Sequence, residues 1–187
     1  MDNKILKSFN VIKEMFNDRK YNIIKESNTD IIYILGNNDK NEKILAYYIS
    51  EKSEMTQKKF VSLVNKLYKE FNFNDNDKFI FVLTFLPEDS NDIPDKINEK
   101  FSSDNIQLFH IKRLQFNITK HILSPKYIKL TESEIESLKK DYDLNNIAKI
   151  PIFDPICKYY DMKTNDIFKI IRKSNNAYQY NTYRIVI

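Results

Sequence analysis

The segment "KIIRKSNNAYQYNTYRIVI", residues 169–187, decides how the C-terminal part of the chain folds. Two runs of β-branched and aromatic residues, 167–173 and 178–187, flank a polar connection at 174–177. Runs of this composition around a short polar loop are typical of a β-hairpin. The segment also carries four cations and three tyrosines. It could therefore instead be a basic and aromatic surface that binds nucleic acid.

The alternation of side chains along a strand tests the nucleic-acid alternative. Arg172 would share a face with Phe168 and Ile170, whereas Lys169 and Lys173 would lie on the opposite face. Cations are therefore expected on both faces, among apolar residues. A nucleic-acid platform would instead gather its cations and aromatic rings on one exposed face. The hairpin is predicted to be structural, with an edge that could pair with another chain.

Composition limits the type of protein. The 187 residues, 42% of them hydrophobic, suffice for one large domain or two small ones. With Gly36 as the single glycine, turns that need a positive φ are expected on Asn and Asp. Cys157 is the single cysteine, so no internal disulfide is possible. No secretory signal or membrane-spanning run is recognisable, so an intracellular protein without a membrane partner is expected.

The charge is distributed unevenly. Up to Asn117 there are 18 Lys and Arg against 18 Asp and Glu, and from Ile118 onward 12 against 8, so the net +4 lies entirely in the C-terminal part. With a sequence pI of about 8.9, this excess is too small for a protein that coats DNA non-specifically.

Hydrophobic periodicity predicts an α+β fold whose first unit, residues 1–116, is an α/β domain with a mixed sheet. Its strand at 78–85 is apolar on both faces and is expected in the middle of the sheet. The other predicted elements are a helix ending near Asp18, strands at 30–36 and 43–50, a helix capped by Thr56, a helix at 93–101 and a strand at 106–111.

The second unit, residues 117–187, is predicted to be a small α+β domain. A short strand at 127–130 precedes Thr131 and Glu134, which have the spacing of a capping box. Asp154 followed by Pro155 is typical of another helix start. Ile156, Tyr159 and Tyr160 would form the inner face of that helix, and the hairpin would follow it.

Candidate metal ligands and nucleophiles are sparse. His110 and His121 fall in different predicted units, and Cys157 is distant from both in sequence, so no pair has the spacing of zinc ligands. Cys157 lies at the start of an amphipathic helix, where a small buried thiol is far commoner than a nucleophile. A glycine-rich phosphate loop is excluded by the glycine content.

A metal-dependent nuclease is the enzymatic alternative. Such enzymes place an acid and an acid-x-Lys triplet on adjacent strands, but Glu51 and Lys52 are neighbours and would point to opposite faces. A relaxed version with Ser50 and Lys52, and with Asp30 or Asp39 as partner, stays open. A free-standing nucleic-acid-binding protein is the third alternative.

Three C-terminal segments carry a family resemblance: "HILSPKYIKLTESEIESLKKDY" (121–142), "DPICKYYDMKTNDIFKIIRKS" (154–174) and "YNTYRIVI" (180–187). In order and spacing they resemble the C-terminal domain of the fifth-largest subunit of eukaryotic RNA polymerases. The three nuclear enzymes share that subunit, and its archaeal counterpart lacks the N-terminal domain. The segment "VIKEMFNDRKYNI" (11–23) resembles the start of the eukaryotic N-terminal domain.

The chain departs from this family pattern at turns. Asp161, Asn165 and Tyr178 stand where the family has glycine, and Ala148 stands where it usually has proline. These losses, the shorter N-terminal domain and the high Asn and Lys content resemble a diverged copy of the kind that large cytoplasmic DNA viruses encode.

The resemblance implies a non-catalytic polymerase subunit without cofactor, metal or small-molecule substrate. Residues 1–116 would form a jaw domain near downstream DNA, and 117–187 would dock on the largest subunit and help assembly with the other subunits. The location implied is the nucleus, or a viral factory or virion if the protein is viral. The predicted partner-binding residues are Asp154, Pro155, Tyr160, Lys169, Ile170, Ile171, Arg172, Lys173, Ser174, Tyr183 and Arg184.

A loop of the family's N-terminal domain that faces downstream DNA would fall near "LPEDSND" (86–92) in this chain. Here it carries Glu88, Asp89 and Asp92, which repel phosphates. The sequence therefore argues against a direct DNA contact by this loop.

Overall fold

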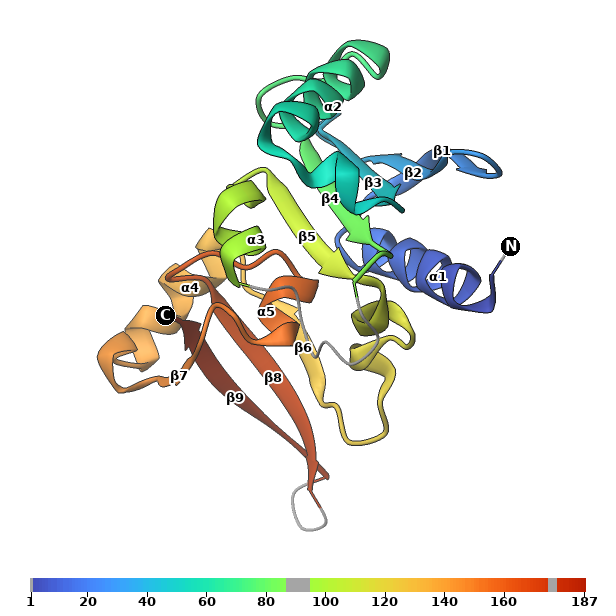
Figure 1. Ribbon diagram of the computed structural model, residues 1–187. Coiled ribbons are helices and arrows are strands. Elements are labelled where there is room, and N and C mark those ends of the chain that lie inside the picture. Colours follow the sequence, from blue (N-terminus) through green and yellow to red (C-terminus); the bar gives the residue numbers. More distant parts are fainter. Residues whose placement is uncertain (1, 87–94, 175–177) are drawn as a thin grey trace. The chain divides into compact units, whose positions relative to one another are not determined.

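The computed structural model describes residues 2–86, 95–174 and 178–187 and contains two compact units, Met1–Phe116 and Asn117–Ile187. Both units combine helices with a sheet, which confirms the predicted α+β class (Figure 1). The segment 87–94, which holds most of the acidic stretch "LPEDSND", lies outside the described residues. No helix in the described part of the chain has the length and apolar character needed to cross a membrane.

The first unit contains a five-stranded mixed sheet in the order β1-β2-β3-β4-β5. The pairs β1-β2 and β2-β3 are antiparallel, and β3-β4 and β4-β5 are parallel. As predicted, β4 lies inside the sheet with both faces buried. The strands span Asn22–Asn28 (β1), Ile32–Asn37 (β2), Lys43–Ile49 (β3), Lys78–Leu83 (β4) and Ile106–His110 (β5).

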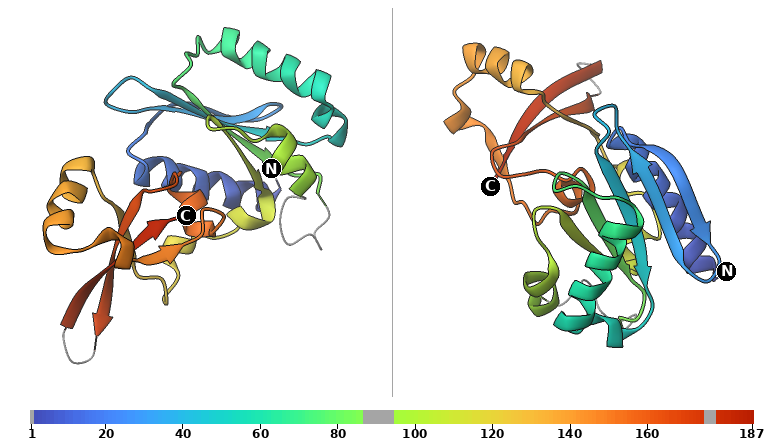
Figure 2. Two further views of the ribbon diagram at one scale, coloured as in Figure 1. Left: turned by 90° about the vertical axis from the view of Figure 1, so that its left-hand side faces the viewer. Right: turned by 90° about the horizontal axis from the view of Figure 1, so that it is seen from above.

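Helices cover both faces of this sheet. Figure 2 shows α1 (Asn3–Asp18) on one face and α2 (Gln57–Glu70) on the other. The parallel steps β3-α2-β4 and β4-α3-β5 run in the same direction across the sheet, so right-handed crossovers put α3 (Asp95–Phe101) on the side of α2. The ring of Phe60 in α2 accordingly packs 4.7 Å from the ring of Phe101 in α3.

The start of α2 differs from the prediction in its chemistry. Thr56 is the N-cap residue, but its side chain makes no capping hydrogen bond. Its backbone carbonyl instead accepts from the Phe60 amide at 2.8 Å. Met55, immediately before the cap, and Phe60 are both buried in one core cluster. An apolar pair at these two positions is a hydrophobic staple, which fixes the helix start without the hydroxyl.

At Gly36 in β2 there is no room for a side chain between the strand and α1. Its backbone does not adopt a positive φ, but a Cβ at this position would lie 3.0 Å from the Asn22 carbonyl oxygen and 3.0 Å from the ring of Phe16. A hydrogen in place of a side chain therefore lets α1 pack closely on the sheet.

The second unit is a four-stranded sheet in the order β6-β8-β9-β7. Its two central strands form the predicted hairpin, paired antiparallel from Ile167↔Ile185 to Ser174↔Tyr178. β6 pairs antiparallel with β8, and β7 pairs parallel with β9. The strands span Lys126–Lys129 (β6), Ala148–Ile150 (β7), Ile167–Ser174 (β8) and Tyr178–Val186 (β9).

Two short helices cover opposite faces of this second sheet. α4 (Glu132–Asp141) begins with the predicted capping box of Thr131 and Glu134, and its Leu138 packs with Ile167. α5 (Pro155–Tyr159) covers the face that carries Phe168. Of the three predicted inner residues, Tyr159 is buried, and Ile156 and Tyr160, the residue after α5, are partly buried; Cys157 is buried as well.

Left-handed backbone occurs largely where the sequence predicts it. Among the described residues, six non-glycine residues have a positive φ, and four of them are Asn or Asp. Asp161 (φ 51°), Asn165 (φ 72°) and Tyr178 (φ 54°) are the positions where the resembling family has glycine. The chain therefore keeps the turn geometry with residues other than glycine, and Tyr178 is the bulkiest of them.

We predict that Tyr178→Gly raises the free energy of unfolding by up to about 1 kcal/mol. The left-handed conformation costs a residue with a Cβ about 1–2 kcal/mol, partly offset by the greater flexibility of glycine in the unfolded chain. Asn165→Gly is the matched control and is expected to change stability by less than about 0.5 kcal/mol, because Asn tolerates this region. Urea denaturation measures both. If Tyr178→Gly lowers the free energy of unfolding more than Asn165→Gly does, the backbone of Tyr178 is not strained.

Candidate docking surface on the C-terminal hairpin

The two faces of the hairpin divide the predicted partner-binding residues. Phe168, Ile170 and Arg172 of β8 face α5, as does Arg184 of β9, which pairs with Phe168. The face toward α4 carries the others with described side chains on these strands: Lys169, Ile171, Lys173 and Tyr183. The structure therefore does not bring the predicted residues together on one surface.

The α5 face is closed by aromatic rings. Phe168 packs edge-on against Tyr127 of β6 at 5.3 Å between ring centroids, and against Tyr160 at 5.7 Å. Asp154 starts α5 by accepting from the Ile156 amide at 2.9 Å, with Pro155 in the first turn. The predicted roles of Asp154 and Pro155 in placing this helix agree with this geometry.

Not every predicted residue is accessible. Ile170 is fully buried in the core of the unit, and its backbone lies between β6 and β9, so a partner cannot contact it directly. Ile171 is half-buried and Lys173 is exposed. Ser174 is the last residue of β8, and its backbone pairs with Tyr178. Whether these residues bind a partner stays a prediction.

A groove of about 360 Å³ lies between α4 and the hairpin. Its lining combines apolar and charged side chains, among them Leu130, Leu138, Glu134, Asp141 and Lys169 of β8. Tyr183 of β9 and Tyr142, which follows α4, also line the groove, with their rings 5.6 Å apart. The sequence pattern places Tyr142 on the apolar stripe of this helix, but it did not indicate a docking role for that residue.

The hairpin cations lack acidic partners. Lys169, Arg172, Lys173 and Arg184 form no ion pair or hydrogen bond through their side chains within the described part of the chain. Arg172 and Arg184 do act on the nearby Tyr127 phenol. Burial raises the pKa of Tyr127, the Asp154 carboxylate raises it further, and the two guanidinium groups oppose that shift.

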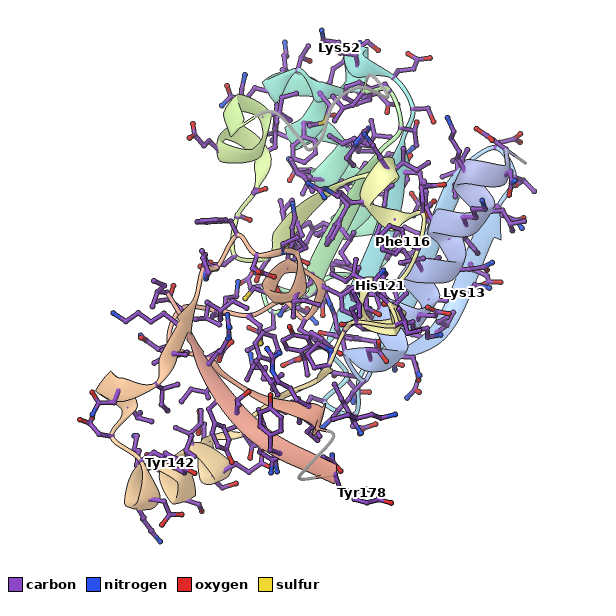
Figure 3. All side chains as sticks on the ribbon, turned by 90° about the horizontal axis from the view of Figure 1, so that it is seen from below. Lys13, Lys52, Phe116, His121, Tyr142 and Tyr178 are labelled. Atoms are coloured by element: carbon purple, nitrogen blue, oxygen red, sulfur yellow. The ribbon has the colours of Figure 1, made fainter. Side chains whose placement is uncertain are left out.

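The outer edge of β9 is open over most of its length. β7 pairs only with Arg184–Val186, and no described strand pairs with the same edge of Tyr178–Tyr183. Tyr178, at the end of the hairpin, has an exposed fraction of 96%, and Tyr180 one of 44%. Figure 3 shows the Tyr178 side chain reaching beyond the end of the strand pair.

The strand motif of the nuclease alternative is not formed. β3 ends at Ile49, so Ser50, Glu51 and Lys52 lie beyond the strand whose alternation the motif requires. Asp39 is in the turn before β3, at the opposite end of that strand, whereas Asp30 precedes β2, at the end where β3 finishes. Among the described residues there is also no cluster of three His, Cys, Asp or Glu side chains that could hold a metal ion.

The fold and this surface define a two-unit α+β chain with an open, cationic hairpin suited to contact with another macromolecule. Residues 116–186, almost the whole second unit, match the family model described as RNA polymerase Rpb5, C-terminal domain. Residues 116–186 therefore form a domain of the Rpb5 C-terminal family, which confirms the resemblance carried by the three quoted C-terminal segments.

Two relatives extend this finding. The chain is 28% identical over 193 residues to a protein of Invertebrate iridescent virus 6 described as a candidate DNA-directed RNA polymerase subunit, covering 96% of this chain and 98% of that protein. It is 34% identical over 86 residues to DNA-directed RNA polymerases IV and V subunit 5B of Arabidopsis thaliana, covering 45% of this chain and 39% of the plant protein.

Cys157 is predicted to be unreactive in the folded protein. It is completely buried, and burial raises the pKa of its thiol from 9.0 to about 11, with Asp154 and Asp166 adding to the shift. At pH 8 its thiolate fraction is then about a hundredfold below that of the unfolded chain. Ellman's reagent should react slowly with the native protein and quickly in urea, and Cys157→Ala should give no signal. Equal rates in both states would contradict this burial.

Proposed function

We propose that the chain is a non-catalytic subunit of a multisubunit DNA-directed RNA polymerase and that it docks through its C-terminal unit on the largest subunit of that enzyme. The observation that carries the proposal is the family match over residues 116–186. The likeness to the viral relative over almost the full length of both proteins supports a role for both units. The catalytic metal site would lie on another subunit.

The surface chemistry of the second unit supports a protein partner. The cations of the hairpin are spread over its two faces, and apolar or aromatic side chains lie between them. A single phosphate backbone would reach only one of these faces. A protein partner that surrounds the hairpin can contact both, and its carboxylates can pair with the free cations.

The first unit would form part of the jaw beside downstream DNA. Its Lys and Arg equal its Asp and Glu in number, so it has little non-specific attraction for phosphates. It would therefore lie next to DNA that other subunits hold. A cellular version would act in the nucleus, and a viral version in the viral factory or the virion.

The docking role is tested by co-purification. A tagged wild-type chain, expressed with the polymerase subunits of its source, is expected to recover the largest subunit. Ile171→Asp puts a carboxylate on the half-buried α4 face of the hairpin and should reduce this recovery at least tenfold. Tyr183→Asp, at the groove, should act in the same direction.

Ile24→Asp is the matched control, because Ile24 is an exposed strand residue of the first unit. It should leave recovery unchanged. Circular dichroism checks that each variant still folds. Recovery of no polymerase subunit by the wild type would refute the function, and full recovery by a folded Ile171→Asp variant would refute docking through this face.

A further inference from the structure

The open edge of β9 is unusual because it lacks the features that normally protect a sheet edge. Natural edge strands carry charged residues, prolines or bulges that prevent pairing with another chain. β1, one of the two edges of the first sheet, has Lys25 and Glu26 and an irregular register. The β9 segment Tyr178–Tyr183, "YQYNTY", has neither charge nor proline, and its register with β8 is continuous.

The backbone of this segment is ready to accept a further strand. In an antiparallel pair, alternate residues direct both N–H and C=O away from the partner strand. About half of the six residues in Tyr178–Tyr183 therefore offer these groups on the side where β7 has ended. An extended polypeptide could pair there in line with β7.

The side chains around the edge indicate the chemistry of that polypeptide. Lys169 and Lys173 on one face of β8, and Arg172 on the other, lie one strand behind the edge, and Arg184 lies at its inner end. None of the four has an acidic partner among the described residues. An added strand would neighbour Arg184 on β9 and lie two strand spacings from the three cations of β8, and carboxylates on it would be attracted by all four.

Two aromatic features fit the same occupant. Tyr178 adopts a left-handed backbone conformation at 96% exposure, a costly arrangement that brings it little packing against the described residues. At the other end of the edge, Tyr183 forms a wall of the groove that Tyr142 and Leu138 also line. In strand addition the backbone gives affinity, and a pocket that receives an alternate side chain gives selectivity.

We propose that the outer edge of β9 binds an extended acidic segment of a partner protein by strand addition, with one apolar side chain of that segment in the groove. This inference rests on the proposed function, because the partner would be a polymerase subunit. The partner presents an extended strand, and the backbone of Tyr178–Tyr183 receives it.

Hydrogen–deuterium exchange of the full-length chain, alone and in the purified polymerase, tests the strand addition. Alternate amides of Tyr178–Tyr183 are expected to exchange at least tenfold more slowly in the complex, because a new ladder protects them. The amides of β4, which are already inside a sheet, provide the internal reference. Unchanged exchange in Tyr178–Tyr183 within an intact complex would overturn the strand addition and leave the proposed function standing.

Charge reversal tests the acidic character of the partner. Arg172→Glu combined with Arg184→Glu should lower recovery of the largest subunit at least tenfold. The matched control is Lys58→Glu combined with Lys66→Glu, which makes the same charge change on exposed positions of α2. Equal recovery by the two double variants would overturn the acidic partner.

Nucleic acid is the rival occupant, and the same preparation distinguishes it. After nuclease digestion of the complex, the protection of Tyr178–Tyr183 should persist. Loss of that protection on digestion, or its appearance when single-stranded oligonucleotide is added to the isolated chain, would overturn the protein segment. A wild-type chain that recovers no polymerase subunit would refute the proposed function itself.

Discussion

The antiparallel pairing of β8 with β9 is the constraint on which the second unit depends. It extends over eight residue pairs and gives each face of the sheet part of its core. Ile167 packs under α4 on one face, and Phe168 packs under α5 on the other. A shift of the register by one residue would exchange these two faces and expose both cores. The short edge strands and both helices therefore take their positions from this hairpin.

The same pairing explains why the surface is both charged and open. Side chains near the base of the hairpin are buried, whereas toward its end Lys173 and Tyr178 are exposed. The strands thus extend beyond the layers that cover them. A hairpin that projects from its own core gains stability when another chain packs against the projecting part. This physical situation suits a subunit that is stable in a larger assembly.

The sequence predicted the elements whose apolar pattern is strong. The period of α1 and α2, the doubly buried β4 and the hairpin were all recognisable, because burial selects residues at fixed spacing. β1 was missed, because its residues are almost all exposed and carry no alternation. The cap of α2 was assigned to the Thr56 hydroxyl, although the staple of Met55 and Phe60 sets the helix start.

The candidate site was predictable in its location but not in its geometry. The family motifs identified the hairpin, yet a linear motif cannot tell that Ile170 is buried or that the cations divide over two faces. The open edge depends on where β7 stops, at Ile150, which local sequence does not determine. The sequence showed only that Tyr178 stands where the family has glycine. It did not show that Tyr178 itself adopts the left-handed conformation.

Chemical cross-linking of the assembled polymerase, followed by mass spectrometry, tests the central claim most directly. Lys169 lies near the base of the hairpin and Lys173 near its end. Lys58 of α2 serves as the cross-linking position on the first unit. The account predicts that both hairpin lysines cross-link to the largest subunit. Lys58 should not cross-link to the same positions of that subunit. Hairpin lysines that cross-link only within their own chain, in an intact polymerase, would contradict it.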